Sequence, residues 1–287
     1  FNYRGFFCWW RDGLSSFRGA GEYANARAQI GQKQQTYSLA WMNPYLLDTL
    51  WRFGVDVSYS INELQSDAYK TNIIGGSIFT NYPLTSYWTF GMKYRLKSSV
   101  FKWTGKTKDM MNADIQLASQ NAGIVTGFGP SLSYDSTDNA FKPHRGVRSF
   151  SEAEIAAVRR RTTDPRVFPF LRLSSLNNYY YPLWKKGTFK LRFELKFLYP
   201  FAEGDPKDVP ESERFYLGGE TTVRGYEPFN IGPKFPKKDG SPDIKSPRGG
   251  ISSLLASIEY MQTIFPMLDV FVFFDGGYVS DREFHIK

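Results

Sequence analysis

The sequence alternates between apolar and polar residues over many separate stretches, and this alternation constrains the fold more than any other feature. The clearest example is the segment 189–197, where five apolar residues, from Phe189 to Phe197, alternate with Lys190, Arg192, Glu194 and Lys196. Successive side chains of a β-strand point to opposite faces, so the segment predicts a strand with one apolar and one charged face. An α-helix would distribute both sets around its circumference.

Ten further stretches show the same period of two. They span residues 21–31, 35–43, 51–61, 71–81, 88–97, 122–135, 147–158, 168–181, 253–260 and 268–280. The sequence therefore predicts an all-β fold of about eleven long antiparallel strands.

The connections between these strands differ in length. Residues 43–48, 81–86 and 182–187 are short and rich in turn-forming residues, whereas 62–70, 99–120 and 200–248 are long and polar. Residues 107–119 have the pattern of a short helix inside one long connection. Short turns at one end and long loops at the other are typical of an outer-membrane β-barrel. A soluble β-sandwich also alternates, and remains the alternative.

Composition narrows the class of protein further. Aromatic residues make up 17% of the chain, and several Tyr and Trp residues lie near strand ends, as in the interfacial girdles of membrane proteins. We find no apolar run near the ~20 residues that a membrane-spanning helix needs. One Cys and two His argue against a disulfide framework and a Cys- or His-rich metal site. The net charge of +8 is dispersed along the strands, which argues against nucleic-acid binding.

One long connection carries a specific motif. Residues 215–226 read FYLGGETTVRGY and residues 230–234 read NIGPK. This segment resembles the characteristic loop of the Omp85 superfamily, and the resembling residues are Val223, Arg224, Gly225, Tyr226, Ile231, Gly232, Pro233 and Lys234. Further similarity lies in Ala256–Glu259, in Val272–Gly277, and in the early turns 18–22 and 43–45. The matching segments span most of the chain and occur in the same order as in the family.

The resemblance implies a transmembrane antiparallel β-barrel in the bacterial outer membrane, of sixteen strands in the family. It implies that residues 200–248 fold into the lumen, where Arg224 meets Asp275, Phe273 and Glu259. The alternation agrees, because it places these three residues on the polar face of their strands. An arginine between carboxylates and an aromatic ring forms charge-assisted hydrogen bonds and a cation–π contact. We also expect Gly225 to allow close approach or a positive φ, and Tyr226 to pack against lumen residues.

The expected domain organisation follows from the same resemblance. Residues 1–19 are expected to form a periplasmic turn region, and residues 20–287 a part of the barrel. The periplasmic POTRA domains of the family and its terminal strands are expected to be absent from this chain.

The function implied by the resemblance is assembly of outer-membrane proteins, without enzymatic chemistry, metal or cofactor. The expected partners are unfolded outer-membrane clients, accessory assembly lipoproteins, the lipid bilayer and lipopolysaccharide, with no nucleic acid. A polypeptide secretion pore of the same superfamily remains the main alternative. A passive porin and a soluble β-rich enzyme or lectin are further alternatives, although no catalytic motif is evident.

Overall fold

The fold was described from a computed structural model covering residues 21–63, 69–103, 122–160, 167–184, 186–201, 209–236, 242–265 and 268–282. Eleven strands of this part form one antiparallel sheet. They are β1 (Tyr23–Ile30), β2 (Gln34–Asn43), β3 (Arg52–Asn62), β4 (Tyr69–Pro83), β5 (Trp88–Trp103), β6 (Gly123–Asp135), β7 (Gly146–Arg160), β8 (Val167–Leu183), β9 (Gly187–Pro200), β12 (Ser252–Phe265) and β13 (Leu268–Ser280). The predicted all-β class and the eleven expected strands are thereby confirmed.

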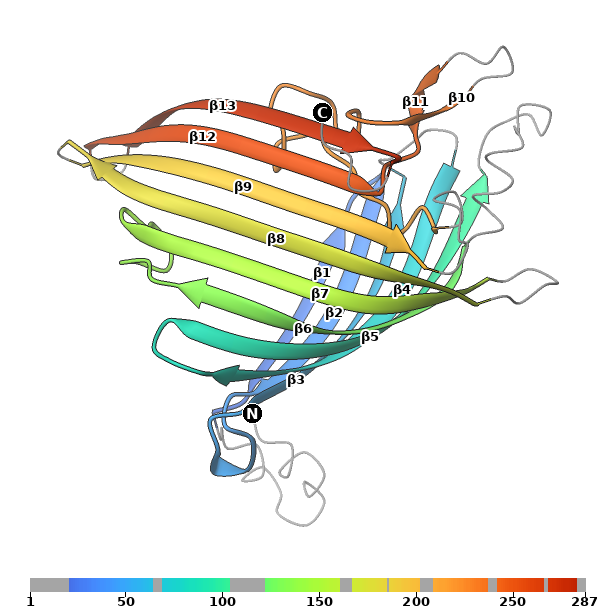
Figure 1. Cartoon of the computed structure of the whole chain (residues 1–287), viewed down its shortest axis with the longest axis horizontal. Coiled ribbons are helices and arrows are strands. Elements are labelled where there is room, and N and C mark those ends of the chain that lie inside the picture. Colours follow the sequence, from blue (N-terminus) through green and yellow to red (C-terminus); the bar gives the residue numbers. More distant parts are fainter. Residues whose placement is uncertain are drawn as a thin grey trace.

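The topology of the sheet is a simple meander. Each strand pairs with its neighbours in the sequence, except that β9 pairs with β12. The intervening chain forms a separate hairpin of β10 (Lys234–Pro236) and β11 (Pro242–Pro247). The sheet curves so that β1–β4 lie behind β6–β9 in Figure 1. Within the described residues β1 and β13 are not paired with each other, so the sheet is an open part of a barrel.

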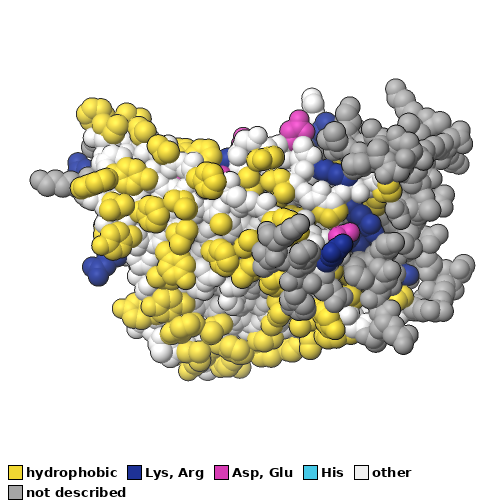
Figure 2. Space-filling model, turned by 45° about the horizontal axis from the view of Figure 1, so that its top comes forward, with side chains coloured by type: hydrophobic (Ala, Val, Ile, Leu, Met, Phe, Trp, Pro, Cys, Tyr) yellow, Lys and Arg dark blue, Asp and Glu magenta, His cyan; other side chains and the backbone are white. Residues whose placement is uncertain are grey.

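The strand register carries the alternation across the whole sheet. Val57 pairs with Gly76, Leu195 with Leu254, and Ile258 with Phe274, so these residues share one face. The other face holds the alternate set, which includes Arg192, Glu194 and Glu259. We call the first the outer face and the second the lumen face. Hydrophobic side chains are spread widely over the outer surface in Figure 2.

The strand connections separate into two groups. At one end β2 leads to β3 through a short 3₁₀ helix (η2, Leu46–Asp48), and tight links join β4 to β5, β8 to β9, and β12 to β13. We call this the turn end. The connection between β9 and β12 leaves from the opposite end. No helix in the described part of the chain is long and apolar enough to cross a membrane.

Two predictions concern residues that the structure does not describe. The periplasmic turn region expected at residues 1–19 and the short helix expected at residues 107–119 both lie outside the described residues.

The lumen face is not uniformly polar, contrary to a simple two-faced expectation. Val125, Val158, Phe170 and Leu198 form a buried cluster on this face together with Phe215 of the connection. These positions are apolar because the connection covers them and excludes water from the wall beneath it. The packing therefore places part of the connection inside the curve of the sheet.

The two faces predict different tolerance to charge. Val57 and Ser58 are neighbours near the middle of β3, but Val57 lies on the outer face and Ser58 on the lumen face. Because the outer face is expected to meet hydrocarbon, Val57→Lys should lower the free energy of unfolding by about 2–4 kcal/mol. Urea unfolding in lipid vesicles measures this, with Ser58→Lys as the matched control. Equal losses in both variants would contradict the assignment of the faces.

Candidate functional site

Arg224 lies at the centre of the candidate site. It belongs to the connection between β9 and β12, and its guanidinium reaches the lumen face of β12 and β13. Nε donates to Asp275 Oδ2 at 2.7 Å and Nη2 donates to Asp275 Oδ1 at 2.8 Å. Nη1 donates to Glu259 Oε2 at 2.8 Å. The guanidinium carbon lies 3.5 Å from the centre of the Phe273 ring.

The strand register creates this receptor for Arg224. Glu259 pairs directly with Phe273, and Ser257 pairs with Asp275, so all four side chains share the lumen face. The Ser257 hydroxyl donates to Asp275 Oδ1 at 2.6 Å and orients the carboxylate. The Asp275 side chain is only 2% exposed. A forked guanidinium facing a nearly buried carboxylate satisfies both charges with directional bonds, which a lysine does not reproduce.

The backbone around Arg224 is held as firmly as its side chain. The Arg224 amide donates to Asp275 Oδ2 at 3.0 Å, so one carboxylate binds both backbone and side chain. Gly225 follows with φ +89°, and no atom lies within 4 Å of the position of an added Cβ. Of the two roles expected for Gly225, the structure therefore supports the positive φ rather than close approach to the wall.

The rest of the motif divides into packed and exposed residues. Val223 is buried against Leu217, Leu255 and Val279, and Ile231 packs on the same cluster. Gly232 has φ +115°, and a Cβ there would lie 2.8 Å from the Val279 side chain. The Pro233 carbonyl accepts the amide of Arg248, and Lys234 Nζ donates to Asn230. Val279 of β13 is therefore the residue of the sheet against which Val223, Ile231 and Gly232 pack.

Tyr226 does not pack as expected. The residue is 59% exposed, although the expectation placed it against lumen residues. Its carbonyl accepts the amide of Gly219, which closes the loop through the backbone. The expected packing of Tyr226 against lumen residues is therefore not found.

A second ionic cluster, which the sequence analysis missed, surrounds Glu213. Its carboxylate receives two hydrogen bonds from Arg95, at 3.0 and 2.7 Å, and one from Lys97 at 2.8 Å. Arg172 donates at 3.2 Å, and Arg95 also donates to Glu154 at 2.6 Å. The Glu213 side chain is completely buried. This cluster joins the connection to β5 and β8 and, through Arg95, to β7.

The electrostatics of Glu213 favour its charged form. Burial alone raises its pKa, but the charges and hydrogen bonds of Lys97, Arg95 and Arg172 outweigh burial and hold the pKa well below its ordinary value. The sequence did contain one sign of this cluster, because the alternation places Arg95, Lys97 and Glu154 on the lumen face of their strands. Inward cations on neighbouring positions require a partner, and the connection supplies one.

A further bond links the connection to β9. Arg192 Nη1 donates to the Thr221 carbonyl at 2.9 Å. Within the described residues, no group of three or more His, Cys, Asp or Glu side chains is arranged to hold a metal ion. The arrangement is therefore suited to holding a segment of chain in place.

Comparison with known proteins identifies the family to which this chain is similar. A family model described as the Omp85 superfamily domain matches residues 16–285. The outer membrane protein assembly factor BamA of Nitratidesulfovibrio vulgaris is 26% identical over 273 residues, which cover 93% of this chain and 32% of the relative. BamA of Neisseria meningitidis serogroup B is 26% identical over 297 residues, covering 92% and 34%. The chain thus spans about a third of the length of these relatives.

A solved structure shares the architecture. The crystal structure of BamA from Haemophilus ducreyi lacking POTRA domains 1–3 matches with a TM-score of 0.66 and 18% sequence identity. The match covers 92% of this chain and 53% of that chain. The likeness shows that the curved sheet has the fold of part of that barrel.

The Glu213 cluster predicts a specific loss of stability. Glu213→Gln leaves Arg95, Lys97 and Arg172 around a neutral amide, and should lower the free energy of unfolding by roughly 3 kcal/mol. Glu220→Gln, on the exposed part of the same connection, is the matched control. Both are measured by urea unfolding in lipid vesicles at pH 7.

The pH dependence of this loss follows from the lowered pKa. A lowered pKa adds stability above the ordinary glutamate value of about 4.3. The difference between wild type and Glu213→Gln should therefore stay constant from neutral pH to about pH 5, and shrink progressively as the pH falls below about 4.3. A difference that already vanishes near pH 6, or an equal effect of Glu220→Gln, would contradict the assignment.

Proposed function

This chain belongs to the Omp85 superfamily of bacterial outer-membrane proteins, and we propose that it forms part of the barrel of an outer-membrane protein assembly factor. The observation that carries the proposal is the seating of Arg224 on Asp275, Glu259 and Phe273. The proposed activity is the insertion and folding of other β-barrel proteins, without enzymatic chemistry or a cofactor.

The physical basis of such an activity is backbone pairing. A nascent transmembrane strand has unpaired N–H and C=O groups, and each one costs several kcal/mol in hydrocarbon. A barrel that exposes a strand edge offers partners for these groups by strand addition. Folding of the client then supplies the free energy.

The anchored connection has a structural role in this proposal. Two ionic clusters, one at Glu213 and one at Arg224, fasten the connection to two different parts of the curved sheet. A sheet that yields at one edge to admit a client needs a rigid remainder. The connection supplies that rigidity by tying β5, β7 and β8 to β12 and β13.

The proposed partners follow from the activity. Unfolded outer-membrane proteins are the clients, and the lipid bilayer and lipopolysaccharide surround the barrel. Accessory assembly lipoproteins are proposed as partners because the two curated relatives are named as assembly factors.

The proposal predicts the effect of removing the Arg224 side chain. Cells that depend on an Arg224→Ala variant should contain several-fold less folded porin than wild-type cells, because the connection loosens from the wall. Heat-modifiability on semi-native gels measures the folded fraction. Arg27→Ala is the matched control, because Arg27 lies on the lumen face of the exposed strand β1, where its side chain is hydrogen-bonded to Gln29 of the same strand.

Two outcomes would contradict the proposed function. The first is a normal level of folded porins in cells that carry only Arg224→Ala at wild-type abundance. The second is normal porin folding together with loss of export of a partner polypeptide, which would favour a secretion pore.

A further inference from the structure

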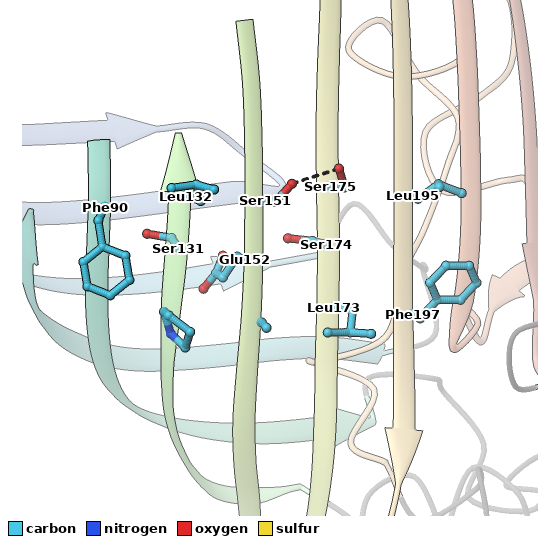
Figure 3. A pocket seen from close by; sticks show the side chains of 12 residues that line it. Phe90, Ser131, Leu132, Ser151, Glu152, Leu173, Ser174, Ser175, Leu195 and Phe197 are labelled. Atoms are coloured by element: carbon cyan, nitrogen blue, oxygen red, sulfur yellow. Dashed lines mark hydrogen bonds between the residues drawn. The ribbon is translucent and has the colours of Figure 1, made fainter. Parts of the chain in front are cut away.

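A hollow of about 480 Å³ lies in the wall formed by β5 to β9 (Figure 3). One row of paired residues crosses this wall in the order Phe90, Leu132, Ser151, Ser175 and Leu195. All five occupy the outer face. The row is bulky at both ends and small in the middle, which produces the depression.

A second row deepens the hollow. Ala153 lies two residues from Ser151 on the same face of β7, and the next residues across the wall are Leu173 and Phe197. Ala153 is again the small member, beside two larger ones. The hollow thus has a floor of small side chains between rims of Phe and Leu.

The interior of the hollow offers no unsatisfied polar group. The Ser151 and Ser175 hydroxyls are hydrogen-bonded to each other at 3.1 Å, shown as the dashed line in Figure 3. Asn177 also donates to Ser175 at 3.0 Å. Ser131, Glu152 and Ser174 border the hollow, but their pairing places them on the lumen face. An occupant therefore meets apolar surface, and needs no polar group of its own.

The hollow begins directly beside a group of interfacial aromatics. Trp88 and Tyr134 have ring centroids 4.8 Å apart, and Tyr87 is 6.2 Å from Tyr134. They lie at the turn end of β5 and β6, where short turns mark the periplasmic side of an outer-membrane barrel. Such rings sit at the level of lipid headgroups. Phe90 and Leu132 lie two residues further along their strands, about 6–7 Å deeper, at the level where acyl chains begin.

We propose that this hollow binds one acyl chain of a phospholipid from the periplasmic leaflet. It is continuous with the lipid-facing outer surface, so the lipid reaches it without crossing any protein. If the depression were empty, its lining atoms would lose dispersion contacts. A flexible acyl chain that fills it restores these contacts. The headgroup of this lipid lies at the level of Trp88 and Tyr134, and the chain runs from Phe90 toward Phe197.

A photo-crosslinking experiment tests the proposal. The purified protein is placed in phosphatidylcholine vesicles that contain a phosphatidylcholine with a diazirine on one acyl chain, and the labelled peptides are mapped by mass spectrometry. Peptides that contain Phe90, Leu173 and Phe197 should be labelled several-fold more than other outer-face peptides.

Matched variants separate a specific site from general lipid contact. Ala153→Phe fills the hollow and should reduce its labelling several-fold. Ala157→Phe adds the same ring to the same face of β7, outside the lining residues, and should leave the labelling unchanged. Heat-modifiability confirms that both variants are folded. If Ala153→Phe is not folded, Ala153→Leu, which fills part of the hollow, replaces it and should also reduce the labelling relative to Ala157→Leu.

Three results would overturn the proposal. They are uniform labelling of the outer face, equal labelling of the two folded variants, and competition by lipid A that exceeds competition by phospholipid.

Discussion

Backbone pairing in hydrocarbon is the constraint from which the rest of this structure follows. A sheet that crosses a membrane must satisfy its N–H and C=O groups internally, and the eleven-strand meander does so between each pair of neighbouring strands, although its two edge strands, β1 and β13, do not pair with each other within the described residues. The two faces of that sheet then meet different surroundings, which the register carries from Val57 and Gly76 to Ile258 and Phe274. Away from the strand ends, charged residues face inward, and there they need partners.

The connection between β9 and β12 supplies these partners in two complementary ways. At Glu213 the connection contributes the carboxylate and the wall contributes three cations. At Arg224 the connection contributes the cation and the wall contributes two carboxylates. The apolar cluster around Val223 and Leu255 fills the space beside Arg224. Because the wall supplies cations to one cluster and carboxylates to the other, the two parts of the connection cannot exchange places on the sheet.

The strands of the sheet and the partners of Arg224 were predictable from the sequence, because the period of two is a local property. All eleven strands were expected, and the parity of Asp275 and Glu259 placed them on the face that Arg224 reaches. The Glu213 cluster was missed, because parity shows which cations point inward but not which distant residue meets them. The exposure of Tyr226 was missed because Tyr226 lies in the connection between strands, where parity along a strand does not apply.

The central claim is that Arg224 and Asp275 bind each other directly in the folded protein. A double-mutant cycle with Arg224→Ala, Asp275→Ala and the double variant, with unfolding measured in lipid vesicles, isolates their interaction. The account predicts a coupling energy of at least about 1.5 kcal/mol, as for close charge pairs elsewhere. Additive losses, with a coupling energy near zero, would contradict it.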